Sequence, residues 1–448
     1  MWKAILSDRA VVSGLLVKLI QGIASPVSAV LTLHYFNPEM QGYYYTFSSL
    51  LALQLFLELG LSTIITTFAA HEWSLLSFDR EGRLVGEAGA LARLSALAKK
   101  TLRWYSIAAG FLAVALICAG TWFFGLHSQS ESVEWQNPWI ALSLLSAINF
   151  LLIPGWALLQ GCGQIAVVNS LRIVEVICRS AVLWGAIVAG AALWSTVAAA
   201  MASIIVAIAF FLFRYRAFFS TLLETKLAST FDWKSEVAPV QWRIAASWIC
   251  GYFIFYLFTP VTFYFLGPVE AGQMGMTWAL VSSLAGLATT WFQVRSPSFG
   301  GLVAQREFGK LDVLAIRTAV TSILVCVVLS GIAIAGLLIL NIYRPGIAGR
   351  FLPLSAVTIF LIAESLHQIP IAQATYLRAF KKEPFLSVSV STAIIVGAGM
   401  LVFIPMLGVI GTSVSYLAGV VGALIGGSYL FFRKRREWTF PRPIVEGA

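Results

Sequence analysis

The stretch VVSGLLVKLIQGIASPVSAVLTLH, at residues 11–34, contains a single charged side chain, that of Lys18. A helix that crosses the hydrocarbon core of a bilayer needs about 20 mainly apolar residues, and this run is long enough. Its apolar residues are continuous rather than alternating, so a membrane β-strand is excluded. The run is too long for a signal peptide and lacks a small-residue cleavage site. We therefore expect a transmembrane helix.

Comparable apolar runs recur along the chain. They cover residues 43–70, 104–126, 138–160, 167–190, 193–213, 244–266, 272–294, 318–340, 353–377, 385–406 and 408–432. With 59% hydrophobic and 11% charged residues among 448, the sequence predicts an all-α polytopic membrane protein of about 12 transmembrane helices. The short connectors leave no room for an extramembrane enzyme domain, and the five cysteines form no CxxC pair. We expect a transporter without a catalytic site, a cofactor or a metal.

The position of the basic residues explains the net charge of +10. If the N-terminus is cytoplasmic, 25 of the 30 lysines and arginines lie in connectors or termini on that side, and only Arg344 and Arg350 lie outside. This asymmetry follows the positive-inside rule. It predicts that both termini are cytoplasmic, and it excludes a nucleic-acid partner as the reason for the charge.

Short internal repeats indicate two related halves. The turn NPEMQG at residues 37–42 shares P-x-x-x-G with GPVEAG at residues 267–272. The tripeptide SPV at residues 25–27 likewise resembles TPV at residues 259–261. Duplicated halves are common in transporters. We predict an N-terminal six-helix bundle at residues 1–216, a cytoplasmic linker at 217–240, and a C-terminal six-helix bundle at 241–448 that ends in a basic cytoplasmic tail.

Polar residues follow one face of the first span. Lys18, Gln21, Ser25, Ser28 and Thr32 have spacings of three and four, which place them on one side of a helix. Such a face lines a water-filled path or packs on polar neighbours. For Lys18 the alternative is that its side chain reaches the cytoplasmic surface. We expect Lys18, Gln21 and Ser25 to contribute to a substrate site.

Two further spans carry candidate substrate residues. Trp248 and Tyr252 lie one turn apart in the seventh span, where their rings could stack on sugars or simply pack between helices. Arg172 and Arg179 lie two turns apart in the fifth span and form either an anion-binding vestibule or an interfacial charge cluster.

Acidic residues within spans are candidates for ion coupling. Glu58 lies inside the second span, and its alternative role is an ion pair with Lys18. Glu364 and His367 lie one turn apart in the tenth span, just before Pro370, where a kink would free backbone carbonyls. We expect these three residues to take part in coupling to H⁺ or Na⁺.

The connector after the second span allows a different interpretation. DREGR at residues 79–83 resembles the D-R-x-G-R motif of major facilitator transporters, but here the connector is about 30 residues long rather than a tight turn. Apolar and basic residues alternate at helical spacing from Leu91 to Arg103, which predicts an amphipathic helix on the membrane surface.

Three segments resemble a known family. They are QGYYYTFSSLLALQLFLELGLS at residues 41–62, WKSEVAPVQWRIAASWICGYF at 233–253 and WFQVRSPSFGGLVAQREFGKL at 291–311. They are similar to bacterial polysaccharide-biosynthesis members, of the O-antigen flippase type, of the multidrug/oligosaccharidyl-lipid/polysaccharide (MOP) exporter superfamily. The resemblance implies two six-helix bundles around a cavity lined by the first and seventh spans.

The resemblance also implies a function. Such proteins flip a polyprenyl-diphosphate-linked oligosaccharide, a polysaccharide or O-antigen repeat unit, across the bacterial inner membrane by alternating access. The implied partners are this lipid-linked oligosaccharide, membrane lipids, and a polysaccharide polymerase with its chain-length machinery. The alternatives are an ion-coupled multidrug or small-solute exporter and a membrane enzyme or scaffold. Drug-exporting relatives often have an acid in the first span, where this chain has Lys18, so we favour an anionic cargo.

Overall fold

A computed structural model describes residues 9–126, 133–225, 238–380 and 382–439 of the chain. The chain divides into two compact units, residues 1–249 and 250–448. The boundary falls inside helix α12 (Ala238–Phe255), near the start of the C-terminal bundle that the sequence predicts. The cytoplasmic position of residues 217–240 stays a prediction.

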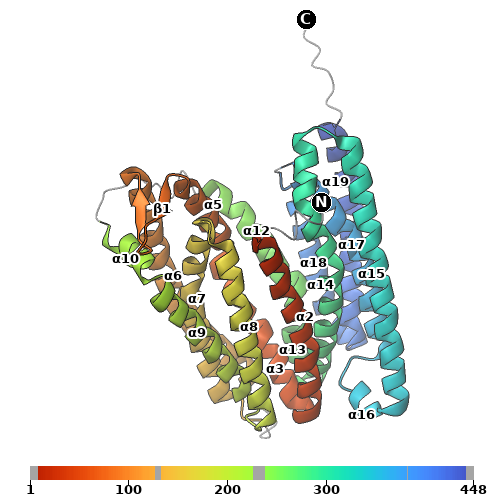
Figure 1. Cartoon of the computed structure of the whole chain (residues 1–448). Helices are drawn as coiled ribbons and strands as arrows, with labels where there is room; N and C mark the ends of the chain where they lie inside the picture. Colours follow the sequence, from red (N-terminus) through yellow and green to blue (C-terminus); the bar gives the residue numbers. More distant parts are fainter. Residues whose placement is uncertain (1–8, 127–132, 226–237, 381, 440–448) are drawn as a thin grey trace, which may run out of the picture. The chain divides into compact units, whose positions relative to one another are not determined.

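The first unit is a bundle of long helices with a small hairpin at one end (Figure 1). Its elements are α2 (Arg9–Tyr35), α3 (Pro38–Leu51), the 3₁₀ turn η1 (Ala52–Gln54), α4 (Leu55–Glu58), α5 (Leu61–Trp73), β1 (Leu76–Phe78), β2 (Leu84–Gly86), α6 (Ala88–Gly125), α7 (Gln136–Gly161), α8 (Ile165–Val188), α9 (Trp194–Arg214), α10 (Arg216–Glu224) and most of α12. Helix α2 packs on α8, α6 packs on α7, and α5 packs on α7.

The second unit is also a helical bundle. Its elements are the end of α12, α13 (Phe258–Leu266), α14 (Pro268–Ala304), α15 (Phe308–Tyr343), α16 (Pro345–Ala348), α17 (Leu354–Arg378), α18 (Leu386–Leu407) and α19 (Ile410–Thr439). Its core brings together the rings of Phe258, Trp278, Phe360 and Tyr416, whose neighbouring centroids lie 5.0–5.8 Å apart.

The predicted spans all fall on helices, and the all-α polytopic membrane class is confirmed. Among the described residues, eight helices are long and apolar enough to cross a membrane, and two bent helix pairs raise this number to as many as ten. The bent pairs are the second predicted span, with a 47° bend before α5, and the seventh, with a 43° bend before α13. The two remaining predicted spans correspond to α8 and α14. Helix α8 carries three charged residues near its middle.

Both P-x-x-x-G turns begin a helix. Pro38 opens α3, and the Asn37 side chain accepts a hydrogen bond from the Met40 N–H at 2.7 Å. Pro268 opens α14 after Gly267, whose φ of 101° suits glycine. Proline fits the first turn of a helix because no helical hydrogen bond there needs its missing N–H. The repeated motif therefore corresponds to the same local structure in each unit.

The predicted surface helix at residues 91–103 is not a separate element. It is the first part of α6, which continues without a break to Gly125. Its apolar face is buried: Leu94 and Leu97 are at most 1% exposed, and the Ser95 hydroxyl donates to the Leu222 carbonyl of α10 at 2.5 Å. The antiparallel hairpin β1–β2 adds Phe78 to the same cluster, 5.9 Å from the Phe218 ring. A protein surface, rather than lipid, covers this amphipathic face.

Glycine permits the close crossing of α5 and α7. A Cβ at Gly161 would lie 2.5 Å from the Ala69 Cβ and 2.6 Å from the Thr66 carbonyl oxygen. We expect Gly161→Ala to force the helices apart and to lower the free energy of unfolding by about 1–3 kcal/mol. Thermal unfolding of the purified protein measures this effect. Gly185→Ala is the control, because a Cβ there meets no atom within 4 Å; equal melting temperatures for the two variants would contradict the prediction.

Candidate functional site

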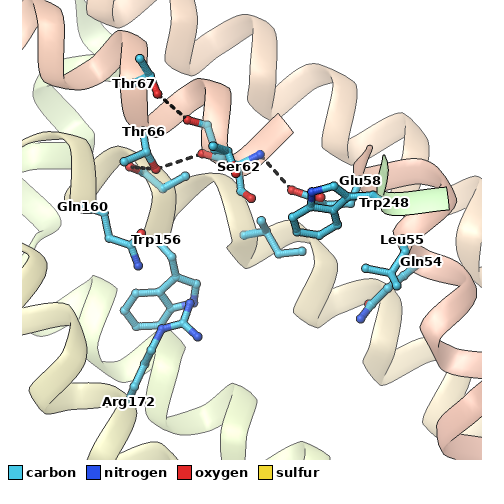
Figure 2. A pocket seen from close by; sticks show the side chains of 13 residues that line it. Gln54, Leu55, Glu58, Ser62, Thr66, Thr67, Trp156, Gln160, Arg172 and Trp248 are labelled. Carbon is cyan, nitrogen blue, oxygen red and sulfur yellow. Dashed lines mark hydrogen bonds between the residues drawn. The ribbon is translucent and has the colours of Figure 1, made fainter. Parts of the chain in front are cut away.

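A pocket of about 480 Å³ lies in the first unit (Figure 2). Side chains from η1, α4, α5, α7, α8 and α12 line it. They are Gln54, Leu55, Glu58, Ser62, Thr63, Thr66, Thr67, Ile153, Trp156, Ala157, Gln160, Arg172 and Trp248. Among the residues that the structure describes, the lining therefore combines one cation, one acid, hydroxyls, amides and two indole rings.

The pocket lies at the break between α4 and α5. Leu59 and Gly60 in the break have positive φ values of 49° and 71°. The left-handed region costs a non-glycine residue about 1–2 kcal/mol, so the break needs compensating interactions. The Glu58 carboxylate provides them, because its oxygens accept the N–H of Gly60 at 2.7 Å and that of Ser62 at 2.8 Å. Glu58, only 3% exposed, thus caps the positive end of α5.

This cap gives Glu58 a structural role that the sequence does not predict. The Tyr105 hydroxyl lies close enough to interact electrostatically with the Glu58 carboxylate, although it makes no hydrogen bond of normal geometry. The outer side of the break packs on α12, since a Cβ at Gly60 would lie 2.2 Å from Ile244 and 3.3 Å from the Trp248 Nε1. Ion coupling through Glu58 stays a prediction.

We expect Glu58→Ala to destabilise the protein. The change leaves the N–H groups of Gly60 and Ser62, at the start of α5, without their acceptor, and an unsatisfied buried group costs about 1–3 kcal/mol. Thermal unfolding of the purified variant should show a clear fall in melting temperature, and Glu224→Ala, at an exposed position on α10, should not. Normal melting of Glu58→Ala would show that the break does not depend on this carboxylate.

Arg172 supplies the positive charge of the pocket. Its side chain is exposed to the pocket, and its guanidinium lies 5.9 Å from the centre of the Trp156 ring (Figure 2). A guanidinium over an indole face is held by a cation–π interaction while its N–H groups remain able to bind an anion. The Glu58 charge is already matched by the end of α5. The pocket therefore offers its cation, rather than its acid, to a ligand.

Hydroxyl groups form the wall opposite Arg172. Ser62, Thr63, Thr66 and Thr67 recur at helical spacing on one face of α5. Thr66 donates to the Ser62 carbonyl at 2.9 Å and lies 3.2 Å from the Ala157 carbonyl, which ties α5 to α7. All four side chains line the pocket, and hydroxyl groups, which both donate and accept hydrogen bonds, suit a ligand rich in hydroxyl groups.

Three of the pocket residues, Glu58, Arg172 and Trp248, were predicted from the sequence as site residues, and the others were not. The spacing of the four hydroxyls on α5 was the available signal, because it follows the same rule as the polar face of the first span. Trp156 and Gln160 gave no comparable signal, since single aromatic and amide residues are common where helices pack.

The predicted polar face of α2 is divided in the structure. Lys18 and Gln21 are exposed and do not line the pocket, and Ser25 is half-buried. Farther along, the Ser28 hydroxyl accepts a hydrogen bond from the Trp184 Nε1 of α8 at 2.9 Å, and Thr32 is fully buried. The far end of this face therefore packs on a neighbouring helix, whereas Lys18 and Gln21 at its near end are exposed.

The charged residues of α8 also have different surroundings. Glu175 accepts a hydrogen bond from Ser203 of α9. Arg179 is exposed and lies within electrostatic range of the Tyr44 hydroxyl of α3, outside the pocket lining. The structure therefore brings Arg172 to the pocket and leaves Arg179 two turns away along the same helix.

The two aromatic candidates of α12 fall in different units. Trp248 belongs to the first unit and lines the pocket. Tyr252 belongs to the second unit, is 4% exposed, and stacks on Tyr256 with 6.2 Å between ring centres. Binding of substrate by Tyr252 stays a prediction.

A buried polar network in the second unit contains the other acidic candidate. Glu364 accepts a hydrogen bond from the Tyr416 hydroxyl, and the His367 Nδ1 lies 3.5 Å from the same carboxylate. Gln368 contacts Glu364 at 3.3 Å and accepts from Ser322 of α15 at 2.9 Å. Glu364 is 5% exposed. The network joins α15, α17 and α19, and it contains a carboxylate, an imidazole and a phenol.

Comparison with solved structures identifies the fold. An inward-facing multidrug resistance MATE family transporter of the MOP superfamily aligns with a TM-score of 0.61 and 14% identity, over 92% of this chain and 98% of that chain. An outward-facing one aligns with a TM-score of 0.60 and 14% identity, over 96% and 95%. The fold is that of the MATE transporters. These folds have 12 helices, which agrees with the predicted number of spans.

The MATE fold also occurs in a MOP superfamily transporter from Pyrococcus furiosus. It aligns with a TM-score of 0.56 and 13% identity, over 98% of this chain and 95% of that chain, and it is described as having a binding pocket of reverse polarity that suggests a different function. The sequence matches no family model and no curated protein. Similarity at this level of identity shows the fold, so the cargo has to be argued from the pocket.

Proposed function

We propose that this chain is a MOP-type flippase that moves an anionic, lipid-linked oligosaccharide across the bacterial inner membrane by alternating access. The observation that carries the proposal is the charge of the pocket in the first unit. Its cation, Arg172, is exposed to a ligand, whereas its acid, Glu58, is buried and bound to the N–H groups of α5. Such a pocket favours an anion over an organic cation.

A diphosphate is the anion that this arrangement suits. Removing a charged group from water costs several kcal/mol unless a cation or hydrogen-bond donors replace the solvent. Arginine binds phosphate through two parallel N–H groups, and Arg172 keeps its guanidinium available above the Trp156 ring. Lys18 is exposed on α2 and Arg179 on α8; in this proposal they attract the same cargo from positions outside the pocket.

The rest of the lining suits a sugar. Pyranose rings present hydroxyls at their edges and C–H groups on their faces, so they bind where polar groups and aromatic rings alternate. The pocket has four hydroxyl side chains on α5, the amides of Gln54 and Gln160, and the indoles of Trp156 and Trp248. The polyprenyl chain of the cargo would remain in the surrounding lipid.

The energy for transport is proposed to come from H⁺ or Na⁺. The buried network around Glu364 supports this idea, because a carboxylate beside an imidazole and a phenol can take up or release a cation with a small rearrangement. His367 and Tyr416 both lie on the Glu364 carboxylate. A polysaccharide polymerase and its chain-length machinery would then receive the flipped product on the other side of the membrane.

The alternative function is export of drugs or small solutes. It is favoured by the fold, since the two MATE structures described above belong to multidrug resistance transporters. A drug exporter for organic cations would need a carboxylate that is open to the ligand, and the carboxylate of Glu58 has its oxygens occupied by backbone N–H groups.

A binding experiment separates the two functions. The purified full chain is titrated with a polyprenyl-diphosphate-linked disaccharide and, in parallel, with ethidium, and thermal unfolding is recorded. We expect the lipid-linked saccharide to raise the melting temperature and ethidium to leave it unchanged. Stabilisation by ethidium alone would favour the drug exporter and contradict the flippase.

A further inference from the structure

A second cavity, of about 270 Å³, lies within the second unit, near the start of α14 and the end of α15. The segment that joins α15 to α17 forms much of its wall. This segment contains the short helix α16, which packs on the end of α15 (Figure 1). Gln273 of α14 and Leu337 and Asn341 of α15 complete the lining. None of these residues lines the pocket of the first unit.

Two hydrogen bonds hold the joining segment against α14. The Gln273 Nε2 donates to the Gly349 carbonyl at 2.9 Å, and the Leu352 N–H donates to the Thr277 hydroxyl at 3.0 Å. Thr277 and Leu352 are at most 3% exposed. The wall of the cavity is therefore fixed before any ligand enters. A site of this kind binds more tightly than one that must be ordered, because less conformational entropy is lost on binding.

The lining of this cavity is uncharged. Among the described residues, no basic or acidic side chain contributes to it, and Arg344 and Arg350 of the joining segment lie outside the lining. Residues 313–363 contain no acidic residue. Moving an ion out of water is costly unless an opposite charge or several hydrogen bonds replace the solvent. The cavity therefore favours a neutral ligand.

The lining combines amide groups with flat apolar surfaces. Asn341 is exposed and Gln273 is half-buried, and a side-chain amide both donates and accepts hydrogen bonds. The rings of Pro345, Phe351 and Pro353 supply the apolar part. A sugar has hydroxyls at the edge of its ring and C–H groups on its faces, so it matches both kinds of surface. Sites for drug-sized ligands measure about 300–1,000 Å³, and this smaller cavity suits a single ring.

We propose that this cavity binds one uncharged sugar residue. The amide of Asn341 and the Oε1 of Gln273 bind its hydroxyls, and Phe351 packs on a C–H face of the ring. Binding of a free sugar at this position is independent of transport. The identification of that sugar with a residue of the transported oligosaccharide rests on the function proposed above.

Saturation-transfer difference NMR on the purified full chain tests the proposal. The protein is kept in lauryldimethylamine oxide, a detergent without a sugar headgroup. The probes are the methyl glycosides of glucose, galactose, mannose and N-acetylglucosamine, with glucuronic acid as a charged sugar. We expect at least one glycoside to bind, and to bind more tightly than glucuronic acid.

Two variants connect this binding to the cavity. A hydrogen bond between uncharged groups contributes about five-fold to an affinity, so Asn341→Leu should weaken the binding of the glycoside by about five-fold or more. Ala348→Phe adds a ring to the cavity wall and should abolish binding. Melting temperatures establish that both variants are folded.

Gln305→Leu is the matched control, because it removes an exposed amide at the end of α14 that does not line the cavity. Glycoside binding should be unchanged in this variant and in Arg172→Gln. The proposal is overturned if none of the four glycosides binds, or if folded Asn341→Leu and Ala348→Phe bind them normally. Binding that depends on Gln160 rather than on Asn341 would place the sugar in the pocket of the first unit and would also overturn it.

A flipping assay with a lipid-linked saccharide separates this site from the proposed function. Glycoside binding that depends on Asn341, without flipping by the unmodified protein, would support the sugar site and contradict the flippase. Flipping by the unmodified protein, together with normal glycoside binding by Asn341→Leu, would contradict the sugar site and leave the flippase standing.

Discussion

Replacing Arg172 by Gln is expected to abolish transport of a lipid-linked saccharide while the protein remains folded. The guanidinium is the cation of the pocket, and its loss leaves the phosphate charge without a partner where water is partly excluded. Removing one member of a desolvated charge pair costs about 2–5 kcal/mol, which corresponds to at least about 30-fold in affinity. Arg172→Lys should retain part of the activity, because the charge remains but the two-pronged geometry is lost.

Reconstituted transport with matched protein amounts measures this effect. Arg80→Gln is the control, because Arg80 lies in the exposed turn between β1 and β2 and does not line the pocket. Arg179→Gln should give a smaller loss than Arg172→Gln, since Arg179 lies outside the pocket lining. Normal transport by Arg172→Gln would show that the pocket does not bind the anionic part of the cargo.

The second large effect is expected at Glu364. Glu364→Gln removes the carboxylate that we propose exchanges a cation but keeps most of the volume of the side chain, and its amide can still contact Tyr416 and His367. Transport driven by a proton or sodium gradient should therefore be lost, because carboxylates within membranes mark the pathways of protons and ions. Binding of the lipid-linked saccharide should be unchanged, because the network lies in the second unit and the pocket in the first.

Tyr416→Phe distinguishes coupling from stability. It removes the hydroxyl that donates to Glu364 and keeps the ring in its aromatic cluster, so we expect a changed pH dependence of transport with a small change in melting temperature. Ser365→Ala is the control on the same helix, because its hydroxyl donates to the Leu361 carbonyl rather than to Glu364. Gradient-driven transport that is unchanged in Glu364→Gln would exclude this network from coupling.

The long apolar runs predict the helices well, because the bilayer requires both the length and the hydropathy of a span. They do not predict the break in the second span. Its backbone has a leucine with a positive φ, and no sequence rule favours leucine there. The break depends on Glu58, whose buried carboxylate binds α5, and which the sequence shows only as an acid inside a span.

The pocket was predictable only in part for a similar reason. Spacing along one helix identifies residues that share a face, and it predicts that Ser28 and Lys18 lie on one side of α2. It does not show which neighbour covers that face, and the Trp184 side chain of α8 covers Ser28. The pocket residues come from six segments, so their meeting depends on tertiary packing that periodicity does not encode.

The most direct test of the proposed function is a flipping assay on the unmodified protein. The purified chain is reconstituted into liposomes with a fluorescent polyprenyl-diphosphate-linked disaccharide, and the fraction of label that an added membrane-impermeant quencher can reach is followed over time. We expect protein-dependent flipping of this lipid, which Arg172→Gln abolishes, and no uptake of ethidium by the same liposomes. Uptake of ethidium without flipping of the lipid-linked saccharide would contradict it.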